Sequence, residues 1–549
     1  MKKNRKACFR KKSFVNFGAG FFNKFLLPIV AMNDSSRASF VFSGAALLCF
    51  SVVSHAADKR PNILFCVADD AGHFSAYGHK WVNTPNFDSV AARGILFDNA
   101  FTCNSKSAPS RACMITGRNS WQLEAAANHW CDFPQKFVSF PEILKKNGYQ
   151  TGYTGKGWGP GIAKNADGTD RKLTGKAYNK IKLVPPTTSI SPIDYSANFD
   201  EFMAQRDPEK PFCFWYGARE PHRAYEYGSS SRYGKKLTDI DSVPAYFPDN
   251  EIVRTDMLDY AVEIEYFDAH LGKILARLDS LGELENTIVI VTSDHGMPFP
   301  RVKGQDYYDS NHIPMAVMWG DRLKNPGRRS EELVSVIDFA PTLLEIAGIN
   351  GESGGMQPIE GNSFMDIIMD DVNPEIDRSC LLMGKERHDV GRPDDQGYPM
   401  RSILKDGFLY IRNYEPDRWP AGNPETGYMN IDGSPTKTEI IKSRHNPATK
   451  YFWDLSMGKR DDAELYDIVH DPLCMNNLHG VAEYGVLEKT LEKEMTERLK
   501  SQGDPRMYGR GDIFDKYPNM CKSRMYWNRT RAGEEVPATW ITPTDFDPL

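Results

Sequence analysis

The segment from Ser107 to Arg111 has the composition of an anion-binding helix start. It reads Ser107-Ala108-Pro109-Ser110-Arg111. Pro109 and Ser110 are residue types that open helices, and the free backbone N–H groups of a first helical turn suit a tetrahedral dianion. Arg111 adds a permanent positive charge beside them. The pattern therefore favours binding of such a dianion near Ser107. The ordinary alternative is a Ser-Pro helix cap without chemistry.

Two apolar runs of strand length, 63–68 and 287–292, each end in polar residues that suit a cation site or a turn. These are Asp69 and Asp70 after the first run, and Asp294 and His295 after the second. Carboxylate oxygens are the hard ligands that Ca²⁺ prefers. An Asp pair after a strand is also common as a turn or helix cap, so each cluster taken alone leaves both interpretations open.

The elements that must position these residues follow from the same pattern. Continuous apolar runs are typical of parallel strands buried on both faces of a sheet. Between the two runs, residues 256–278 carry apolar side chains at helical spacing, which ends near Gly282. Helix-then-strand alternation predicts a doubly wound α/β sheet, and ligands gather outside the carboxyl ends of its strands. The two acidic clusters are therefore expected to meet at that edge.

From about residue 375 the pattern changes to shorter apolar segments separated by turns. The segments that indicate a small antiparallel sheet and a closing amphipathic helix are 401–404, 407–412, 464–467 and 487–499. The predicted fold class is therefore α/β, with a large mixed, mostly parallel sheet flanked by helices and a smaller C-terminal antiparallel-sheet subdomain. We divide the mature chain into an N-terminal domain that carries the site, at 58–374, and this subdomain, at 375–549.

The N-terminus has the pattern of an export signal. A basic opening, Lys2 to Lys12, precedes an apolar run at 40–53 that ends in a small-residue cleavage pattern. The run is too short for a membrane span, and no later stretch approaches one. We predict a leader or signal peptide at 1–57, with Met32 as an alternative start. The mature chain is then expected to be exported, periplasmic or secreted, with no membrane span.

The composition limits the classes of function. The chain has 549 residues, is 40% apolar and 26% charged, and carries a net charge of −6. This acidic balance argues against nucleic-acid binding, and an anionic substrate would need a local basic pocket. The ten cysteines include no CxxC pair, which weakens zinc and thioredoxin-type interpretations. Cys66 and Cys213 lie in apolar runs and are expected to be buried free thiols.

Residues 107–118 resemble the signature of the sulfatase family, in which a Cys or Ser, a spacer, Pro-Ser-Arg and a final Thr-Gly-Arg recur at this spacing. The resemblance implies that Ser107 is the modified residue, oxidised to formylglycine (3-oxoalanine), whose hydrated aldehyde supplies the nucleophile. A serine at this position implies a partner enzyme of the radical-SAM maturase type. Arg111 is then expected to orient the nucleophile and the sulfate group.

The same resemblance implies one calcium ion, held by Asp69, Asp70, Asp294 and His295 beside the modified Ser107, with contact to the sulfate as the alternative role of His295. It also implies three further catalytic residues. Lys156, in the segment 154–159, would contact the sulfate, His222 would assist the leaving group, and Lys303 would neutralise charge on the transferred group. The family usually has a histidine two residues after this lysine, and here the position is Trp158. The substrate is therefore held differently there, or another group replaces the histidine.

Within the family the motifs are most similar to those of the heparan N-sulfatases, at 221–223, 293–300 and 398–402. This implies a sulfatase that hydrolyses sulfate esters or N-sulfates of sulfated glycans, and it leaves the sugar open. The predicted substrate-binding residues are Trp158, His388, Asp389, Arg392 and Arg401. The alternative for the last four is a solvated loop charge. Two alternatives stay open: a phosphoryl-transfer hydrolase of the same superfold with unmodified Ser107, and a non-catalytic protein that binds sulfated glycans.

Overall fold

The structure is a computed structural model that describes residues 59–547. The predicted leader at 1–57 lies outside the described residues. The described residues form one compact unit. Among them, no helix has both the length and the apolar character needed to cross a membrane. All eight cysteines of the described chain are free thiols, and Cys66 and Cys213 are buried as expected.

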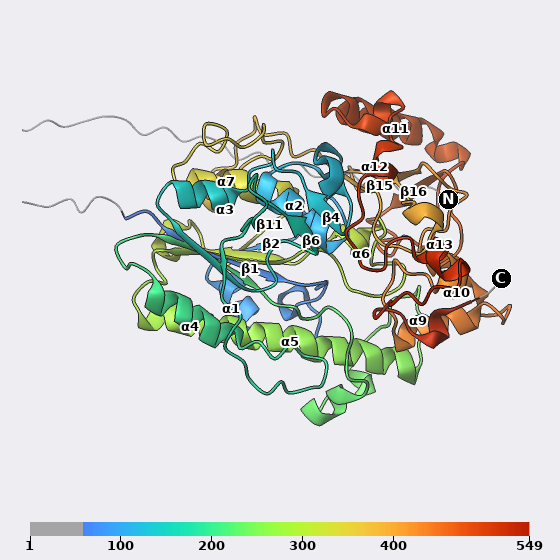
Figure 1. Cartoon of the computed structure of the whole chain (residues 1–549), viewed down its shortest axis with the longest axis horizontal. Coiled ribbons are helices and arrows are strands. Elements are labelled where there is room, and N and C mark those ends of the chain that lie inside the picture. Colours follow the sequence, from blue (N-terminus) through green and yellow to red (C-terminus); the bar gives the residue numbers. More distant parts are fainter. Residues whose placement is uncertain (1–58, 548–549) are drawn as a thin grey trace, which may run out of the picture. The chain divides into compact units, whose positions relative to one another are not determined.

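A large mixed sheet forms the centre of the fold (Figure 1). Its strands are β1 (Asn62–Ala68), β2 (Ile95–Phe97), β5 (Gln150–Gly155), β7 (Lys176–Ala177), β8 (Phe212–Gly217), β9 (Thr287–Ser293), β10 (Met315–Met318) and β11 (Arg328–Ser330). They are ordered β11-β2-β10-β9-β1-β8-β5-β7. Only β10 pairs antiparallel with its neighbours in this sheet, and the remaining pairs are parallel. The predicted mixed, mostly parallel sheet is confirmed.

The two central strands, β1 and β9, are buried along their whole length. Alternate side chains of β1 enter two separate cores: Leu64 and Cys66 pack on one face, and Ile63 and Phe65 on the other. Successive side chains of a strand point to opposite faces, so a strand covered on both sides must be apolar throughout. This is why both strands were recognisable as continuous apolar runs.

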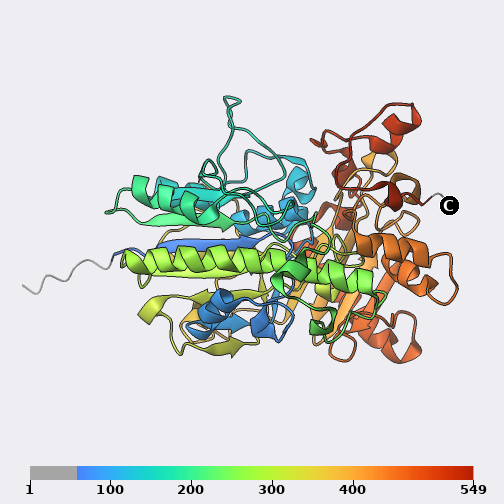
Figure 2. The same ribbon diagram turned by 90° about the horizontal axis from the view of Figure 1, so that it is seen from below.

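Helices cover both faces of this sheet (Figure 1). One face carries α1 (Pro85–Ala92), α4 (Tyr195–Gln205) and α5 (Glu251–Ser280), and the other carries α2 (Ser107–Thr116), α3 (Phe140–Lys146) and α7 (Phe339–Ile346). Figure 2 shows α5 crossing the first face between α4 and α1. The helix predicted at 256–278 begins earlier because the Asn250 side chain accepts the Val253 N–H and caps it.

A four-stranded antiparallel sheet lies in the C-terminal part. It consists of β13 (Cys380–Lys385), β14 (Met400–Lys405), β15 (Phe408–Asn413) and β16 (Ala463–Asp467), paired in that order. Helix α11 (Gly485–Ser501) packs on it through Leu491, Met495 and Leu499. The predicted small sheet and closing helix are confirmed. The first strand, β13, had no counterpart among the predicted segments.

The remaining elements are short. Two two-stranded pairs join β3 (Ala100–Phe101) to β12 (Val334–Ser335) and β4 (Cys131–Phe133) to β6 (Gly161–Ala163). The other helices are α6 (Tyr308–Asn311), α8 (Met365–Ile368), α9 (Pro435–Ser443), α10 (Lys450–Ser456), α12 (Ile513–Lys516) and α13 (Tyr526–Arg531).

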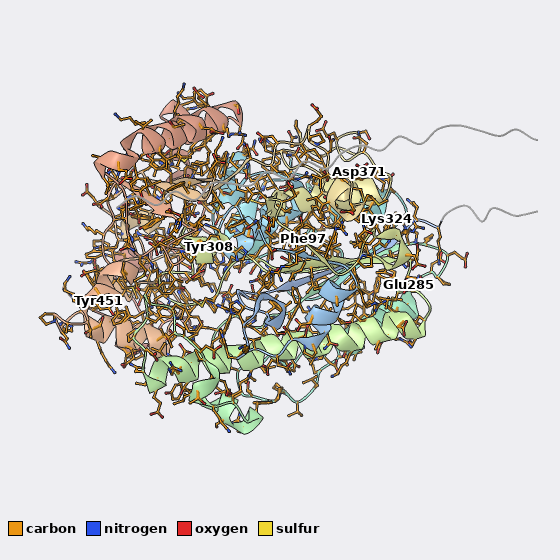
Figure 3. All side chains as sticks on the ribbon, turned by 180° about the vertical axis from the view of Figure 1, so that it is seen from behind. Phe97, Glu285, Tyr308, Lys324, Asp371 and Tyr451 are labelled. Atoms are coloured by element: carbon orange, nitrogen blue, oxygen red, sulfur yellow. The ribbon has the colours of Figure 1, made fainter. Side chains whose placement is uncertain are left out.

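The parallel strands run toward the C-terminal part of the chain. In Figure 3, Glu285, which precedes β9, lies at one end of the molecule, whereas Tyr451 of α10 lies at the other. Phe97 of β2 lies between them, inside the molecule. The carboxyl ends of β1 and β9 therefore face the segments that follow residue 375, which can supply side chains to any site at that edge.

Candidate active site

Helix α2 places Ser107 in its first turn. The helix begins at Ser107, two residues before the expected Pro109, and Lys106 is its extended N-cap residue. The Ser110 N–H already bonds the Lys106 carbonyl, and the Ser110 hydroxyl donates to the Asp294 carbonyl at 2.6 Å. The N-terminus of α2 is therefore tied directly to the loop after β9. The backbone N–H groups at positions 107 and 108 stay available to an anion.

The Ser107 hydroxyl lies among charged groups from three other segments. Its Oγ is 3.2 Å from Asp69 Oδ1, 3.0 Å from Lys156 Nζ and 3.5 Å from His295 Nε2. Lys156 Nζ also donates to both oxygens of Asp69, at 2.6 and 2.7 Å. Burial lowers the pKa of Lys156, and the Asp69 carboxylate only partly opposes this. The structure thus brings Asp69, Ser107 and Lys156 together as predicted.

Arg111 lies at the bottom of the site and holds its acidic residues in place. It is fully buried, and its Nε donates to Asp294 Oδ2 at 2.8 Å while Nη2 donates to Asp69 Oδ1 at 3.2 Å. Its Nη1 donates to the carbonyls of Lys156 and Gly157. Burial alone would raise the pKa of Asp294, but the Arg111 guanidinium together with His295 and Lys156 outweighs it and keeps that pKa well below its usual range. Arg111 therefore links both acidic clusters and the lysine segment.

The two acidic clusters meet at the edge of the sheet. Ligand atoms of Asp70, Asp294 and His295 lie within 4.8 Å of one another, and all three side chains are buried. His295 Nδ1 donates to the Gly296 carbonyl at 3.0 Å, so Nε2 is the ring nitrogen that faces Asp70. That Nε2 is 2.8 Å from Asp70 Oδ1. An imidazole nitrogen and a carboxylate oxygen at this separation can serve as ligands of one cation.

Lys303 occupies a buried position between two carboxylates. Its Nζ lies 2.6 Å from Asp70 Oδ2 and 2.5 Å from Asp432 Oδ2, and its side chain is 1% exposed. Burial alone would lower the pKa of Lys303, but the Asp432 and Asp70 carboxylates outweigh it and raise that pKa. His222 lies next to Asp70 and Asp432. Its Nδ1 donates to the Arg223 carbonyl at 2.7 Å, so its Nε2 is free to exchange a proton.

The net charge of this cluster is compatible with a bound divalent cation. Four carboxylates, of Asp69, Asp70, Asp294 and Asp432, face three cationic groups, of Arg111, Lys156 and Lys303. The cluster therefore carries one net negative charge. A bound Ca²⁺ would convert this to one net positive charge, which matches the single negative charge of a sulfate monoester.

A pocket of about 750 Å³ opens onto these residues. Asp69, Ser107, Lys156, His222 and Lys303 line it together with aromatic and polar side chains from both parts of the chain. The pocket is large enough for a sugar residue or a small oligosaccharide. A buried hydroxyl surrounded by fixed positive charge and an acidic cation site fits transfer of a tetrahedral anionic group.

Comparison with known proteins decides the family. The family model described as Sulfatase matches residues 61–349, a span of 289 of the 549 residues. The chain belongs to the sulfatase family. It is accordingly a sulfuric ester hydrolase, and the matched span contains the catalytic and metal-binding residues predicted from the sequence.

Several sulfatases resemble this chain along most of its length. An ulvan-active sulfatase of Formosa agariphila is 28% identical over 82% of each chain. The human N-sulphoglucosamine sulphohydrolase is 27% identical over 81% of this chain and 91% of its own. A solved structure in complex with its substrate D-glucosamine-2-N,6-O-disulfate has a TM-score of 0.55 at 22% identity, covering 81% of this chain and 99% of that one. This last likeness concerns the fold.

The predicted substrate-binding residues of this sulfatase divide into two groups. Asp389 and Trp158 line the pocket. His388, Arg392 and Arg401 are buried and do not line it. His388 Nε2 contacts Asn104 Oδ1 at 2.8 Å, and Arg392 donates to the carbonyls of Trp419 and Pro420.

Arg401 is held by two carboxylates. Its guanidinium pairs with Asp504 and Glu386, each at 2.7 Å. These contacts occupy the N–H donors of its guanidinium within the protein. A buried guanidinium between two carboxylates has a structural role in the C-terminal sheet. The expectation that Arg401 and Arg392 would reach a substrate is therefore not supported by their positions.

Other pocket residues were not recognised from the sequence. They are Lys106, His129, Trp130, Arg219, Glu263, Asp432 and Trp540. Lys106 adjoins Ser107 in the sequence, so its place in the signature segment was an available signal, and its Nζ pairs with Asp389 Oδ2 at 2.6 Å. Asp432 lies in an irregular segment far from every motif. No local pattern distinguishes such a residue from an ordinary loop acid.

Proposed function

We propose that this sulfatase is an exported, calcium-dependent enzyme that removes sulfate from sulfated glycans, with Ser107 converted to formylglycine before export. The observation that carries the proposal is the position of the Ser107 side chain. It lies at the N-terminus of α2, within hydrogen-bond distance of Asp69 and Lys156 and next to His295. An oxygen attached at this position would face a sulfate group held by the helix N-terminus.

The residues around this position have separable roles in the proposal. Arg111 holds Asp69 and Asp294 in place and contributes positive charge at the base of the site. Lys156 Nζ binds a sulfate oxygen and orients the nucleophilic oxygen. Lys303 neutralises charge on the transferred group. His222 Nε2 gives its proton to the departing oxygen or nitrogen, because its Nδ1 is committed to a backbone carbonyl.

Two groups complete the proposed site. Asp70, Asp294 and His295 would hold calcium, together with Asp69 and the modified residue, and the ion would supply Lewis-acid polarisation of sulfate oxygens. The hydrated aldehyde of formylglycine would supply one hydroxyl whose oxygen attacks sulfur, and a second hydroxyl that would lose its proton and restore the C=O bond, so that sulfate leaves with the first oxygen. Because the precursor is a serine, a maturase of the radical-SAM type is the expected partner.

The proposed substrate class is a sulfated saccharide. The relatives named above carry names that refer to ulvan and to sulphoglucosamine. The pocket is consistent with a sugar because Trp130, Trp158 and Trp540 line it alongside polar groups. Aromatic faces pack well on sugar rings, and polar groups fix their orientation. Whether the sulfate is carried on nitrogen or oxygen is left to a substrate screen.

The first prediction concerns Ser107. In a host that contains a serine-type maturase, the peptide containing Ser107 is expected to lack two hydrogens by intact-peptide mass spectrometry, and the protein to release sulfate from defined sulfated disaccharides. Ser107→Ala is expected to abolish sulfate release, since no nucleophile can form. The matched control is the wild-type sequence expressed without the maturase, which keeps an ordinary serine and is expected to be inactive.

Two results would contradict this proposal. Full sulfate release by Ser107→Ala would exclude Ser107 as the source of the nucleophile. An unmodified serine in protein from a maturase-containing host would instead favour the two alternatives. Assay with phosphate monoesters would then distinguish phosphoryl transfer by the hydroxyl from binding of sulfated glycans without catalysis.

A further inference from the structure

Glu263 lies on the surface of the pocket, and its carboxyl group has no partner among the described residues. It lies in the middle of α5, is 2% exposed and lines the active-site pocket. Among the described residues, no hydrogen bond or ion pair reaches its carboxyl group. Buried side-chain polar groups nearly always have a partner, and an acidic group without one has a specific reason to be there.

The two neighbouring acidic residues, unlike Glu263, have hydrogen-bond donors within the protein. Glu220, on the same pocket, accepts the Tyr195 hydroxyl at 2.7 Å and the Ser191 N–H at 2.8 Å. Asp259, one turn before Glu263 on α5, accepts the backbone N–H groups of Gly228 and Ser230. The fold therefore provides donors for both neighbours and none for Glu263. The space next to the Glu263 carboxyl belongs to the pocket, so the missing partner is expected to come from a ligand.

The surroundings favour the neutral form of this carboxyl. Burial raises the pKa of Glu263 well above its usual range, and the Glu220 and Asp259 carboxylates raise it further. The other titratable groups that interact with it are the phenols of Tyr225 and Tyr266, which are neutral at pH 7. A neutral carboxyl donates through its O–H and accepts through its C=O. A sugar hydroxyl also donates and accepts, so the two groups form a matched pair.

We propose that Glu263 determines substrate specificity by binding, through its carboxyl group, a hydroxyl group of the saccharide that carries the sulfate. This inference rests on the proposed function and adds a contact that holds the sugar rather than the sulfate. A second anionic group of the substrate does not fit this position, because Glu220 and Asp259 lie nearby. The contact is absent for sulfate esters without sugar hydroxyls.

The test compares two ligands on a protein that binds without turnover. Calcium-loaded Ser107→Ala serves as the parent, with Glu263→Ala and Glu263→Gln added to it. A panel of defined sulfated disaccharides is titrated by calorimetry, and 4-nitrophenyl sulfate by ligand-observed NMR. Glu263→Ala is expected to weaken disaccharide binding about tenfold, because one buried hydrogen bond is lost. The affinity for 4-nitrophenyl sulfate is expected to stay unchanged. Glu263→Gln keeps a donor and an acceptor and is expected to stay within about twofold of the parent.

A matched control lies two residues further along α5. Glu265 accepts the Asn83 N–H at 2.8 Å and pairs with Lys235 away from the pocket, so Glu265→Ala is expected to leave both affinities unchanged. Thermal unfolding distinguishes a structural role. Because the fold gives Glu263 no partner, Glu263→Ala is expected to melt no lower than its parent.

Several outcomes would overturn the inference. Unchanged disaccharide binding by Glu263→Ala would remove Glu263 from the substrate site. Equal losses of disaccharide affinity in the Ala and Gln variants would mean that the ligand needs a charged carboxylate. Equal losses of affinity for both ligands would mean a general disturbance of the pocket.

No binding by any disaccharide would overturn this inference and the saccharide assignment together. Disaccharide binding with the expected Glu263 effect, but no sulfate release by mature wild-type enzyme, would overturn the proposed function alone.

Discussion

Lys303 shows how a single residue sets the charge balance of the site. Its ammonium is buried and lies within 2.6 Å of carboxylates from two distant segments, those of Asp70 and Asp432. Burial alone would raise the pKa of Asp432, but the Lys303 ammonium together with His222 and Lys106 outweighs it and lowers that pKa well below the usual range. Both carboxylates are therefore ionised in the folded protein, and this ammonium is the largest of the favourable charges that each of them faces.

Lys303→Met is predicted to destabilise the protein by about 3–5 kcal/mol, because removing one member of a buried ionic group leaves the others uncompensated. Urea unfolding at pH 7 in calcium-free buffer measures this effect. The double variant Lys303→Met with Asp432→Asn removes one of the stranded charges and is expected to recover part of the loss. A single variant as stable as the wild type would show that Asp70 and Asp432 find other compensation.

At the scale of elements, the carboxyl ends of β5 and β8 place Lys156. Gly155 is the last residue of β5 and has φ +78°, and a Cβ added there would lie 1.9 Å from the Gly217 carbonyl oxygen. The Lys156 N–H donates to the same oxygen at 2.6 Å. Only glycine permits this approach of two strand ends, and the approach directs the following lysine into the pocket.

Gly155→Ala is predicted to push the end of β5 away from β8 and to displace Lys156. A displacement of about 1 Å in a positioning residue costs roughly 10²-fold in turnover, and the strained backbone costs about 1–3 kcal/mol of stability. Steady-state kinetics and urea unfolding check the two effects separately. Gly485→Ala, at the start of α11, adds a Cβ with no atom within 4 Å and is the matched control, with both quantities expected to be unchanged. Wild-type turnover by Gly155→Ala would contradict the argument.

At the scale of the whole molecule, the site is assembled from segments that are far apart in the chain. Asp70 follows β1, Asp294 and His295 follow β9, and Asp432 comes from the C-terminal part. The division into domains at 58–374 and 375–549 stays a proposal. Asp389 and Asp432 nevertheless come from the second range and meet Lys106 and Lys303 of the first.

Calcium is predicted to stabilise the folded protein because its ligands converge only after folding. An ion that binds the folded state alone adds about 2.7 kcal/mol at a concentration one hundred times its Kd. Chelation is therefore expected to lower the melting temperature and abolish sulfate release, and added calcium to restore both. Magnesium is the control and is expected to restore less, because it demands near-ideal octahedral geometry and loses its water ligands reluctantly. A melting temperature independent of calcium would contradict a metal site at Asp70, Asp294 and His295.

The sequence alone determined the features that depend on local periodicity and on the signature segment. The central strands were recognisable because both of their faces are buried, and the small C-terminal sheet followed from short apolar segments between turns. The family followed from residues 107–118, because this segment resembles the sulfatase signature. The roles of the individual site residues stay predictions, although the structure gathers Asp69, Ser107, Arg111, Lys156 and Asp294 at one edge.

Tertiary structure alone decided which charged residues reach the pocket. Arg392 and Arg401 resemble substrate-binding residues in sequence, yet inside the protein their guanidinium groups are bound to carbonyls and carboxylates. Asp432 and Glu263 have no distinctive sequence context, yet they lie on the pocket. A side chain's partners come from segments distant in sequence. The free-energy cost of burying a charged group depends on whether such partners compensate its charge. The resemblance to the sulfatase signature therefore predicted the nucleophile, the apolar runs predicted the sheet edge, and only the packed fold decided what surrounds them.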